Sequence, residues 1–242
     1  MIPKMESAMM PVPCWIQRPE VQQATILSAE SAHTLAEIVM NAHHLGHSVN
    51  SRTRYASQAK WDINMKFRSS RNIPTRLDGL EHGFNTMQTF AERSMPAFGL
   101  SEDLHTLVPV DDQCLLYETG DYVRDHADDS ALVHAEHGCQ VWRAVKPDRH
   151  LVGIVWLTSQ CEDVVPTCGE IRGYAFSGGE LRVNSLIETD TGLPLCVRPQ
   201  AGTMVLFPAS PWFRHEVLPV RGGTRVALTR WWKVCAKDST DH

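Results

Sequence analysis

The sequence predicts a mainly β fold, an antiparallel sandwich or barrel with helices packed on its outside. Two observations predict this class. Amphipathic helical patterns occupy the N-terminal part, and short β-like runs separated by Gly, Pro and polar turns follow Val108. A third observation concerns domain number. No repeat, low-complexity tract or linker divides the 242 residues, and 43% hydrophobic content supports a sizeable core, so we expect one domain.

Two helices are expected before the β region. The first begins after Ser28, a suitable N-cap, and ends at Leu45, because apolar residues recur there every three or four positions and Gly46 follows. A second pattern of this kind covers residues 80–94. The polar segment 47–77 between them shows no firm period.

The strands are expected in a series after the second helix, in runs that are rich in β-formers and bounded by turn residues. These runs are QCLLYETGDYVRDHAD, HLVGIVWLTS, GGELRVNSL, AGTMVLFPAS, HEVLPV and TRVALTRWW.

Charge and composition exclude several classes of function. The net charge is -5 and Lys and Arg are scattered, so nucleic acid is not an expected partner. The longest apolar run, LVGIVWL, is far shorter than the ~20 residues that span a bilayer. The N-terminus has no signal-peptide core, and the seven cysteines form no C-x-x-C pair. We therefore expect a soluble cytoplasmic protein with reduced thiols.

Three side chains suggest a metal site. His126 and Asp128 are two residues apart, so in a strand they share a face, and His215 opens a later β run. Two imidazoles and one carboxylate on adjacent strands occupy one face of an octahedral metal and leave three positions open. This set suits ferrous iron that binds a co-substrate and dioxygen, whereas a structural zinc site is closed by four ligands.

The last β run also places an arginine on a defined face. Strand alternation puts Arg225, Ala227, Thr229 and Trp231 on one side. If that side faces inward, Arg225 needs an anionic partner, such as a substrate or a cofactor.

Several motifs in order resemble one known family. Y-x-x-G-D-Y precedes H-x-D, and R-H-L-V-G-I-V-W-L-T and F-S-G-G-E-L-R-V follow. P-Q-A-G-T-M-V-L-F-P and H-E-V-L-P-V-R-G-G-T-R close the series. Over residues 108–233 the chain resembles the iron(II)- and 2-oxoglutarate-dependent dioxygenases, in particular the prolyl-4-hydroxylase-like branch.

The resemblance implies a double-stranded β-helix, a jelly-roll, cupin-like barrel supported by N-terminal α-helices. Residues 1–242 would form a single dioxygenase domain, with 1–107 as the helical support region and 108–233 as the barrel core. It also implies that the catalytic centre binds Fe(II) through His126, Asp128 and His215.

Arg225 would bind the distal carboxylate of 2-oxoglutarate, by the same resemblance. Trp156 stands where some relatives carry a tyrosine that also contacts 2-oxoglutarate, so Tyr117 and Thr229 are the candidates for that hydroxyl. O2 would be the second co-substrate, and ascorbate is a candidate further cofactor. Trp156, Trp212 and Arg124 are candidate substrate contacts.

The expected reaction is hydroxylation, or another oxidation, of an unactivated C–H bond of a small molecule such as an amino acid or a biosynthetic intermediate, with release of succinate and CO2. Three alternatives stay open: a peptidyl-prolyl hydroxylase that acts on a protein or peptide, a catalytically silent metal-binding barrel, and a sugar-binding jelly roll. The connection 159–177 is a candidate substrate-covering loop.

Overall fold

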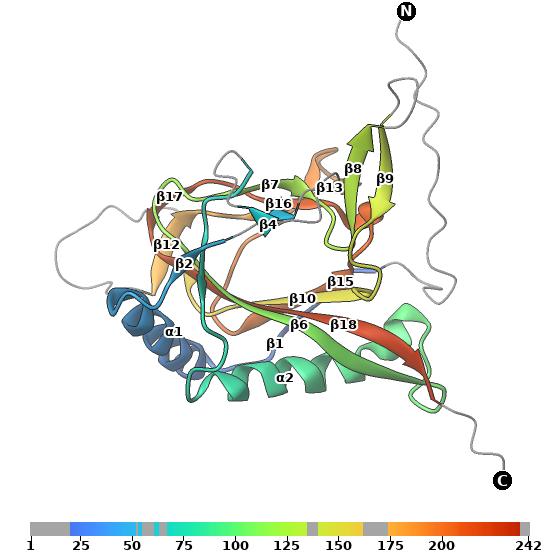
Figure 1. Ribbon diagram of the computed structural model, residues 1–242, viewed down its shortest axis with the longest axis horizontal. Helices are drawn as coiled ribbons and strands as arrows, with labels where there is room; N and C mark the ends of the chain where they lie inside the picture. Colours follow the sequence, from blue (N-terminus) through green and yellow to red (C-terminus); the bar gives the residue numbers. More distant parts are fainter. Residues whose placement is uncertain are drawn as a thin grey trace, which may run out of the picture.

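Two layers of β-sheet face each other, and two helices cover the outer face of the larger layer (Figure 1). The computed structural model describes residues 20–51, 53–54, 61–62, 67–134, 140–161 and 174–237. The mainly β class and the predicted jelly-roll arrangement with helical support are confirmed. Within the described residues, no helix has the length and apolar character needed to cross a membrane.

The larger sheet has seven strands in the order β1-β15-β10-β18-β6-β5-β2, and all neighbouring pairs with a resolved register are antiparallel. Its strands are β1 (Gln22–Thr25), β15 (Thr203–Pro208), β10 (Leu151–Trp156), β18 (Arg225–Ala236), β6 (His105–Tyr117), β5 (Arg71–Ile73) and β2 (Val49–Asn50). The segment before residue 108 thus contains three strands of this sheet, β1, β2 and β5, in addition to the two helices. Strand β6 also begins before that residue, at His105. The division at 107 and 108 stays a prediction.

The opposing layer is made of shorter strands. A four-stranded sheet has the order β14-β13-β16-β7, and a three-stranded sheet, β11-β12-β17, lies at one end of the molecule (Figure 1). The hairpin of β8 and β9 stands at the other end. The strands are β7 (Val123–His126), β8 (Ser130–His134), β9 (Gln140–Ala144), β11 (Ser159–Gln160), β12 (Ala175–Gly178), β13 (Leu181–Ile187), β14 (Pro194–Val197), β16 (His215–Val217) and β17 (Val220–Gly223). A separate small pair joins β3 (Thr53–Arg54) to β4 (Trp61–Asp62).

Both predicted helices are confirmed. Helix α1 spans Ala29–His44, and the Ser28 hydroxyl accepts a hydrogen bond from the backbone N–H of Ser31 at 3.0 Å, which is an N-cap. Helix α2 spans Leu80–Arg93 and is followed by the 3-10 turn η1 (Met95–Phe98). Each helix turns an apolar face toward the larger sheet.

Strand β18 separates two hydrophobic cores. Leu228 and Trp232 are fully buried in the core between the sheet and the helices. On the other side of β18, Ala227 and Trp231 belong to the core between the two sheets. Each fully buried large apolar side chain contributes roughly 1.5–3 kcal/mol to folding. The alternation predicted for this strand is therefore confirmed, and the Arg225 face points between the sheets.

Candidate metal centre

Two histidines meet at neighbouring strand ends. His126 is the last residue of β7 and His215 is the first of β16, and the antiparallel register pairs them directly. Their ring centroids are 4.5 Å apart. The register between β7 and β16 therefore brings the two imidazoles together.

Asp128 completes the group from the residues just after β7. Its carboxylate oxygens lie 3.8 Å from Nε2 of His126 and 3.7 Å from Nε2 of His215. The backbone N–H of Asp128 donates to the carbonyl of Ala209 at 3.1 Å, which fixes the turn that carries it. One ligand atom from each of the three residues lies within 4.8 Å of the others, as a shared metal ion requires.

Backbone carbonyls orient both imidazoles. Nδ1 of His126 is 2.8 Å from the carbonyl of Arg124, and Nδ1 of His215 is 2.9 Å from that of Phe213. When each Nδ1 carries the proton and donates to its carbonyl, each Nε2 keeps a lone pair directed at the cluster. Burial, with His215 close by, lowers the pKa of His126 to about 4, so this imidazole is neutral at neutral pH.

The Asp128 carboxylate shows that the group fits a cation. Its Oδ2 atom is buried and has no hydrogen-bond partner among the described residues. A buried carboxylate oxygen without a partner is costly, and a metal ion held together with the two Nε2 atoms removes that cost. Two imidazoles and one carboxylate are also the donor set that ferrous iron uses in oxygenases.

Arg225 provides a second unsatisfied group. It is the first residue of β18 and is only 1% exposed. Its Nε donates to the carbonyl of Gly179 at 3.0 Å, but its Nη2 is buried without a partner in the described part of the chain. The guanidinium lies over the ring of Tyr117, 4.7 Å from the centroid. Burial lowers the pKa of Arg225, so an anion that pairs with it would relieve an uncompensated charge.

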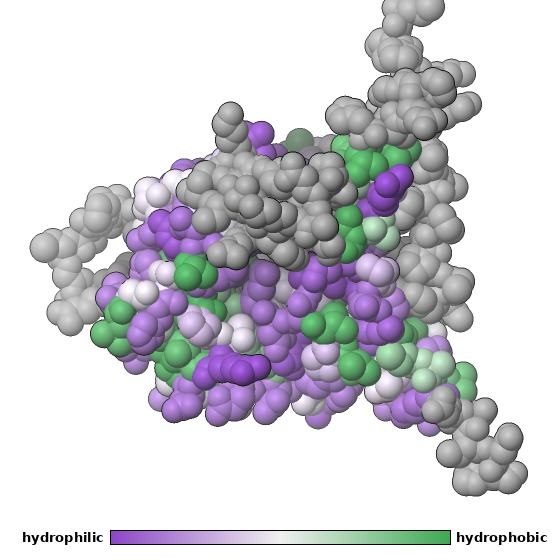
Figure 2. All heavy atoms as spheres, in the orientation of Figure 1, coloured by the Kyte–Doolittle hydropathy of each residue, from purple (hydrophilic) through white to green (hydrophobic). Residues whose placement is uncertain are grey.

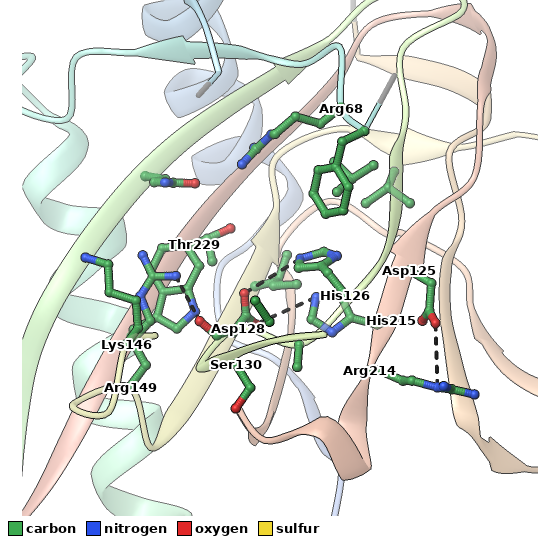
Figure 3. A pocket seen from close by; sticks show the side chains of 18 of the residues that line it. Arg68, Asp125, His126, Asp128, Ser130, Lys146, Arg149, Arg214, His215 and Thr229 are labelled. Carbon is green, nitrogen blue, oxygen red and sulfur yellow. Dashed lines mark hydrogen bonds and ion pairs between the residues drawn. The ribbon is translucent and has the colours of Figure 1, made fainter. Parts of the chain in front are cut away.

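A single pocket of about 380 Å³ contains these groups. Figure 3 shows Asp128 facing both histidines, with a dashed line to each, and Thr229 on the neighbouring wall. The pocket lining includes the three metal-site residues, Arg225 and the two residues predicted to offer a hydroxyl to 2-oxoglutarate. These are His126, Asp128, His215, Arg225, Tyr117 and Thr229.

The three predicted substrate contacts lie elsewhere. None of Trp156, Trp212 and Arg124 is among the residues that line the described pocket. Trp156 is fully buried in the core between the sheets, Trp212 in the turn η3 (Pro211–Phe213) is 43% exposed, and Arg124 is exposed. Most of the candidate covering loop 159–177, from 162 to 173, is outside the described residues.

Other lining residues were not found from the sequence. Arg68 lies in the segment without a period, where no pattern could assign a face. Gln113 pairs with Thr229 across β6 and β18, which alternation could have revealed. Arg149 stacks on Trp231, with its guanidinium carbon 3.8 Å from the ring centroid, and only the folded structure brings these two together.

Fold and site together define a class: a jelly-roll-like β-sandwich whose interior holds two histidines and one carboxylate, as in non-haem iron oxygenases. The model of the 2OG-Fe(II) oxygenase superfamily matches residues 112–233, half of the chain. The chain belongs to this superfamily. It is an oxidoreductase of the dioxygenase class, and its family uses Fe(II), 2-oxoglutarate and O2.

Solved prolyl hydroxylases share the fold. A Pseudomonas putida prolyl-4-hydroxylase is 19% identical with a TM-score of 0.56, over 89% of this chain and 92% of that one. The viral collagen prolyl hydroxylase of Paramecium Bursaria Chlorella virus-1, in its 2OG complex, is 15% identical with a TM-score of 0.51, over 88% and 94%.

A third similar structure carries a peptide. The prolyl hydroxylase of Trichoplax adhaerens, in complex with a hypoxia inducible factor oxygen degradation domain peptide fragment, is 14% identical with a TM-score of 0.58, over 88% and 83%. A comparison with curated proteins gave no match. At these identities the likeness concerns the fold, and the substrate has to be argued from the pocket.

Proposed function

We propose that this chain is a 2-oxoglutarate-dependent hydroxylase of a small molecule, with His126, Asp128 and His215 as the iron ligands. Arg225 binds the distal carboxylate of 2-oxoglutarate. The observation that carries the proposal is the placement of an unpartnered carboxylate oxygen and an unpartnered guanidinium nitrogen in the walls of one pocket. The first needs a cation and the second needs an anion.

Iron bound here would supply the oxidising chemistry, using O2 and the decarboxylation of 2-oxoglutarate to succinate and CO2. The chain itself positions the reactants. Arg225 and Tyr117 hold the far end of the co-substrate, while the carbonyls of Arg124 and Phe213 keep the imidazoles aligned. The apolar walls that Leu115, Ile154 and Ala227 provide exclude water, which strengthens each ionic contact.

The size of the pocket supports a small molecule. A volume of about 380 Å³ lies at the lower end of the roughly 300–1,000 Å³ typical of ligand sites. 2-Oxoglutarate takes part of this space, and the remainder suits a compact substrate. The same proposal includes ascorbate as a reductant that keeps the iron in the Fe(II) state. It also includes residues 1–242 as a single dioxygenase domain.

The second candidate is a peptidyl-prolyl hydroxylase. Its support is the Trichoplax adhaerens structure, in which a protein of this fold holds a peptide fragment. A catalytically silent barrel is less well supported, because a structural site gives Arg225 no reason to be buried without a carboxylate partner.

Succinate release distinguishes these candidates. The full chain, with Fe(II), 2-oxoglutarate and ascorbate, is assayed against a panel of small molecules and against proline-containing peptides. Small-molecule turnover supports the proposal, and turnover with peptides alone would replace it with the peptidyl hydroxylase. An Asp128→Asn variant is the matched negative control. Equal succinate release by this variant would show that the activity does not come from this site.

A further inference from the structure

The pocket wall is strongly cationic, although the chain as a whole has a net charge of -5. Cationic side chains outnumber carboxylates among the lining residues. The cations are Arg68, Lys146, Arg149, Arg214 and Arg225, and the carboxylates are Asp125 and Asp128.

Most of these cations have an acidic partner. Arg214 lies 3.6 Å from Asp125. Arg149 and Lys146 both reach one carboxylate oxygen of Asp111, at 2.8 Å and 3.3 Å. These contacts belong to the protein's own structure, and Asp111 carries one negative charge for its two cations.

Two of the arginines that line the pocket, Arg225 and Arg68, have no carboxylate contact among the described residues. The proposed function assigns the distal carboxylate of 2-oxoglutarate to Arg225. Iron(II), Asp128, Arg225 and the dianionic co-substrate then sum to zero charge. Arg68 then remains in the wall as a positive charge with no carboxylate in contact, which disfavours an empty or neutral pocket.

Arg68 is held in place by its surroundings. Its Nε and Nη2 donate to the hydroxyl of Ser70 at 3.3 Å and 3.0 Å, and Ser70 bonds to Ser51 at 3.0 Å. Its backbone forms an isolated bridge with Val123 of β7, three residues before His126. A serine hydroxyl does not neutralise a guanidinium, so Arg68 keeps its capacity for an anion.

The Arg68 side chain lines the same pocket as the metal cluster. In Figure 3 the Arg68 guanidinium reaches over the pocket on the side of Thr229, across from Asp128. Burial lowers the pKa of Arg68, and the nearby Tyr117 and Asp128 partly oppose this effect. An anion bound to Arg68 would therefore lie beside the metal cluster, where a substrate is needed.

The wall at the β8–β9 hairpin is apolar. Leu132 and Trp142 pair across the hairpin, and both line the pocket. Leu132 is 47% exposed, and Figure 2 shows hydrophobic side chains gathered where the hairpin stands. Trp231 extends this surface from β18. A substrate that contacts Arg68 can therefore rest an apolar body on this wall.

We propose that Arg68 binds a carboxylate of the substrate, so that the substrate is a small organic acid with an apolar body and without a free amine. The inference rests on the proposed function and specifies its substrate class. The missing amine follows from the acids present. Asp125 is already bonded to Asn184 at 2.9 Å and paired with Arg214, and Asp128 is the proposed iron ligand. An ammonium group would have no available carboxylate in the described wall.

Matched acids and amides test the proposal. The full chain, loaded with Fe(II) and 2-oxoglutarate under nitrogen, is titrated with N-acetyl-L-leucine, hexanoate and benzoate, and with their three primary amides. The readout is the shift of the visible charge-transfer band. We expect at least one acid to bind at least about tenfold more tightly than its amide, because a hydrogen-bonded ion pair is lost in the amide.

Two variants test whether Arg68 causes the preference for acids over amides. Arg68→Gln should abolish it and leave the dissociation constant of 2-oxoglutarate within about twofold of the wild-type value. Arg214→Gln is the matched control, since it removes another arginine of the same pocket that is already paired, and it should keep the preference. If Arg68→Gln does not fold, the comparison of acids with amides in the wild type still tests whether the site binds a carboxylate.

Failure of the substrate-class inference and failure of the proposed function give different results. Equal binding of acids and amides, or no binding by any acid, overturns the inference, as does an Arg68→Gln variant that loses affinity for 2-oxoglutarate instead. A wild type that gives no band with iron and 2-oxoglutarate overturns the proposed function and the inference with it.

Discussion

Arg225 and Tyr117 are direct partners in the register of β18 and β6, with the guanidinium carbon 4.7 Å from the ring centroid. Arg230 on the same strand faces the other way and forms an ion pair with Asp112, with contacts of 2.6 Å and 2.7 Å. One strand therefore carries a satisfied arginine toward the helices and an unsatisfied one toward the pocket. A ligand explains this difference, because packing alone would favour pairing both.

Removal of the Arg225 charge should weaken the binding of 2-oxoglutarate. Arg225→Gln loses a charged hydrogen bond worth about 1.5–3 kcal/mol, which is roughly a ten- to hundredfold rise in the dissociation constant. Arg225→Lys should recover part of the lost affinity, because lysine restores the charge but lacks the planar guanidinium that can donate two parallel hydrogen bonds to a carboxylate. Quenching of tryptophan fluorescence by 2-oxoglutarate, with Fe(II) under nitrogen, measures both.

Arg230→Gln is the control for that experiment. It removes the pair with Asp112 and the bond to the carbonyl of Phe84 at 3.0 Å, so the free energy of unfolding should fall by about 1–3 kcal/mol. The affinity for 2-oxoglutarate should stay the same. An affinity that drops in Arg230→Gln but not in Arg225→Gln would show that the wrong arginine has been assigned.

Gly179 supports Arg225 through its backbone. It has a φ of +67°, its carbonyl accepts from Arg225, and a Cβ placed there would lie 3.1 Å from Cδ of Arg225. Gly179→Ala should lower both thermal stability and 2-oxoglutarate affinity. Gly192→Ala has the same φ of +67° with nothing within 4 Å, so it should cost only the backbone strain of about 1–2 kcal/mol. Melting temperature and 2-oxoglutarate titration compare the two variants, and equal affinities would count against the supporting role.

The stability of the metal-free protein should depend on pH through His126. Its pKa falls from 6.5 to about 4 on folding, so between these values the unfolded chain binds a proton that the folded chain excludes. The free energy of unfolding should therefore decrease as the pH falls through this window, by up to about 3 kcal/mol. Urea denaturation with a chelator at several pH values measures the effect.

Replacement of the imidazole removes this contribution. His126→Gln should flatten the pH dependence over that window, whereas His82→Gln, at an exposed position on α2, should leave it as in the wild type. A slope that is unchanged in His126→Gln would mean that other groups cause the loss of stability.

The sequence predicted the parts of the site that depend on local periodicity. Alternation along β18 placed Arg225 and Thr229 on the inner face, and the two-residue spacing put His126 and Asp128 near each other. Helices α1 and α2 were also predictable, because an apolar stripe marks each of them and a capping serine marks the start of α1.

Contacts between distant segments were not predictable in this way. Arg68 reaches the pocket because its segment forms a bridge with β7, although it has no period of its own. Trp156 was a candidate substrate contact because of the family resemblance, but it does not line the described pocket and is buried in the core between the sheets. An inner sheet face has to fill that core as well as line the cavity. The short strands β2 to β5 gave no signal, since two or three residues are too few to show alternation.

The most direct test of the central claim is an anaerobic titration of the full chain with Fe(II) in the presence of 2-oxoglutarate, followed by visible absorbance. We expect a charge-transfer band that saturates near about one iron per chain. His126→Ala and His215→Ala, both shown to be folded by circular dichroism, should fail to form the band. No band in the wild type, or an undiminished band in both variants, would show that His126, Asp128 and His215 do not bind iron.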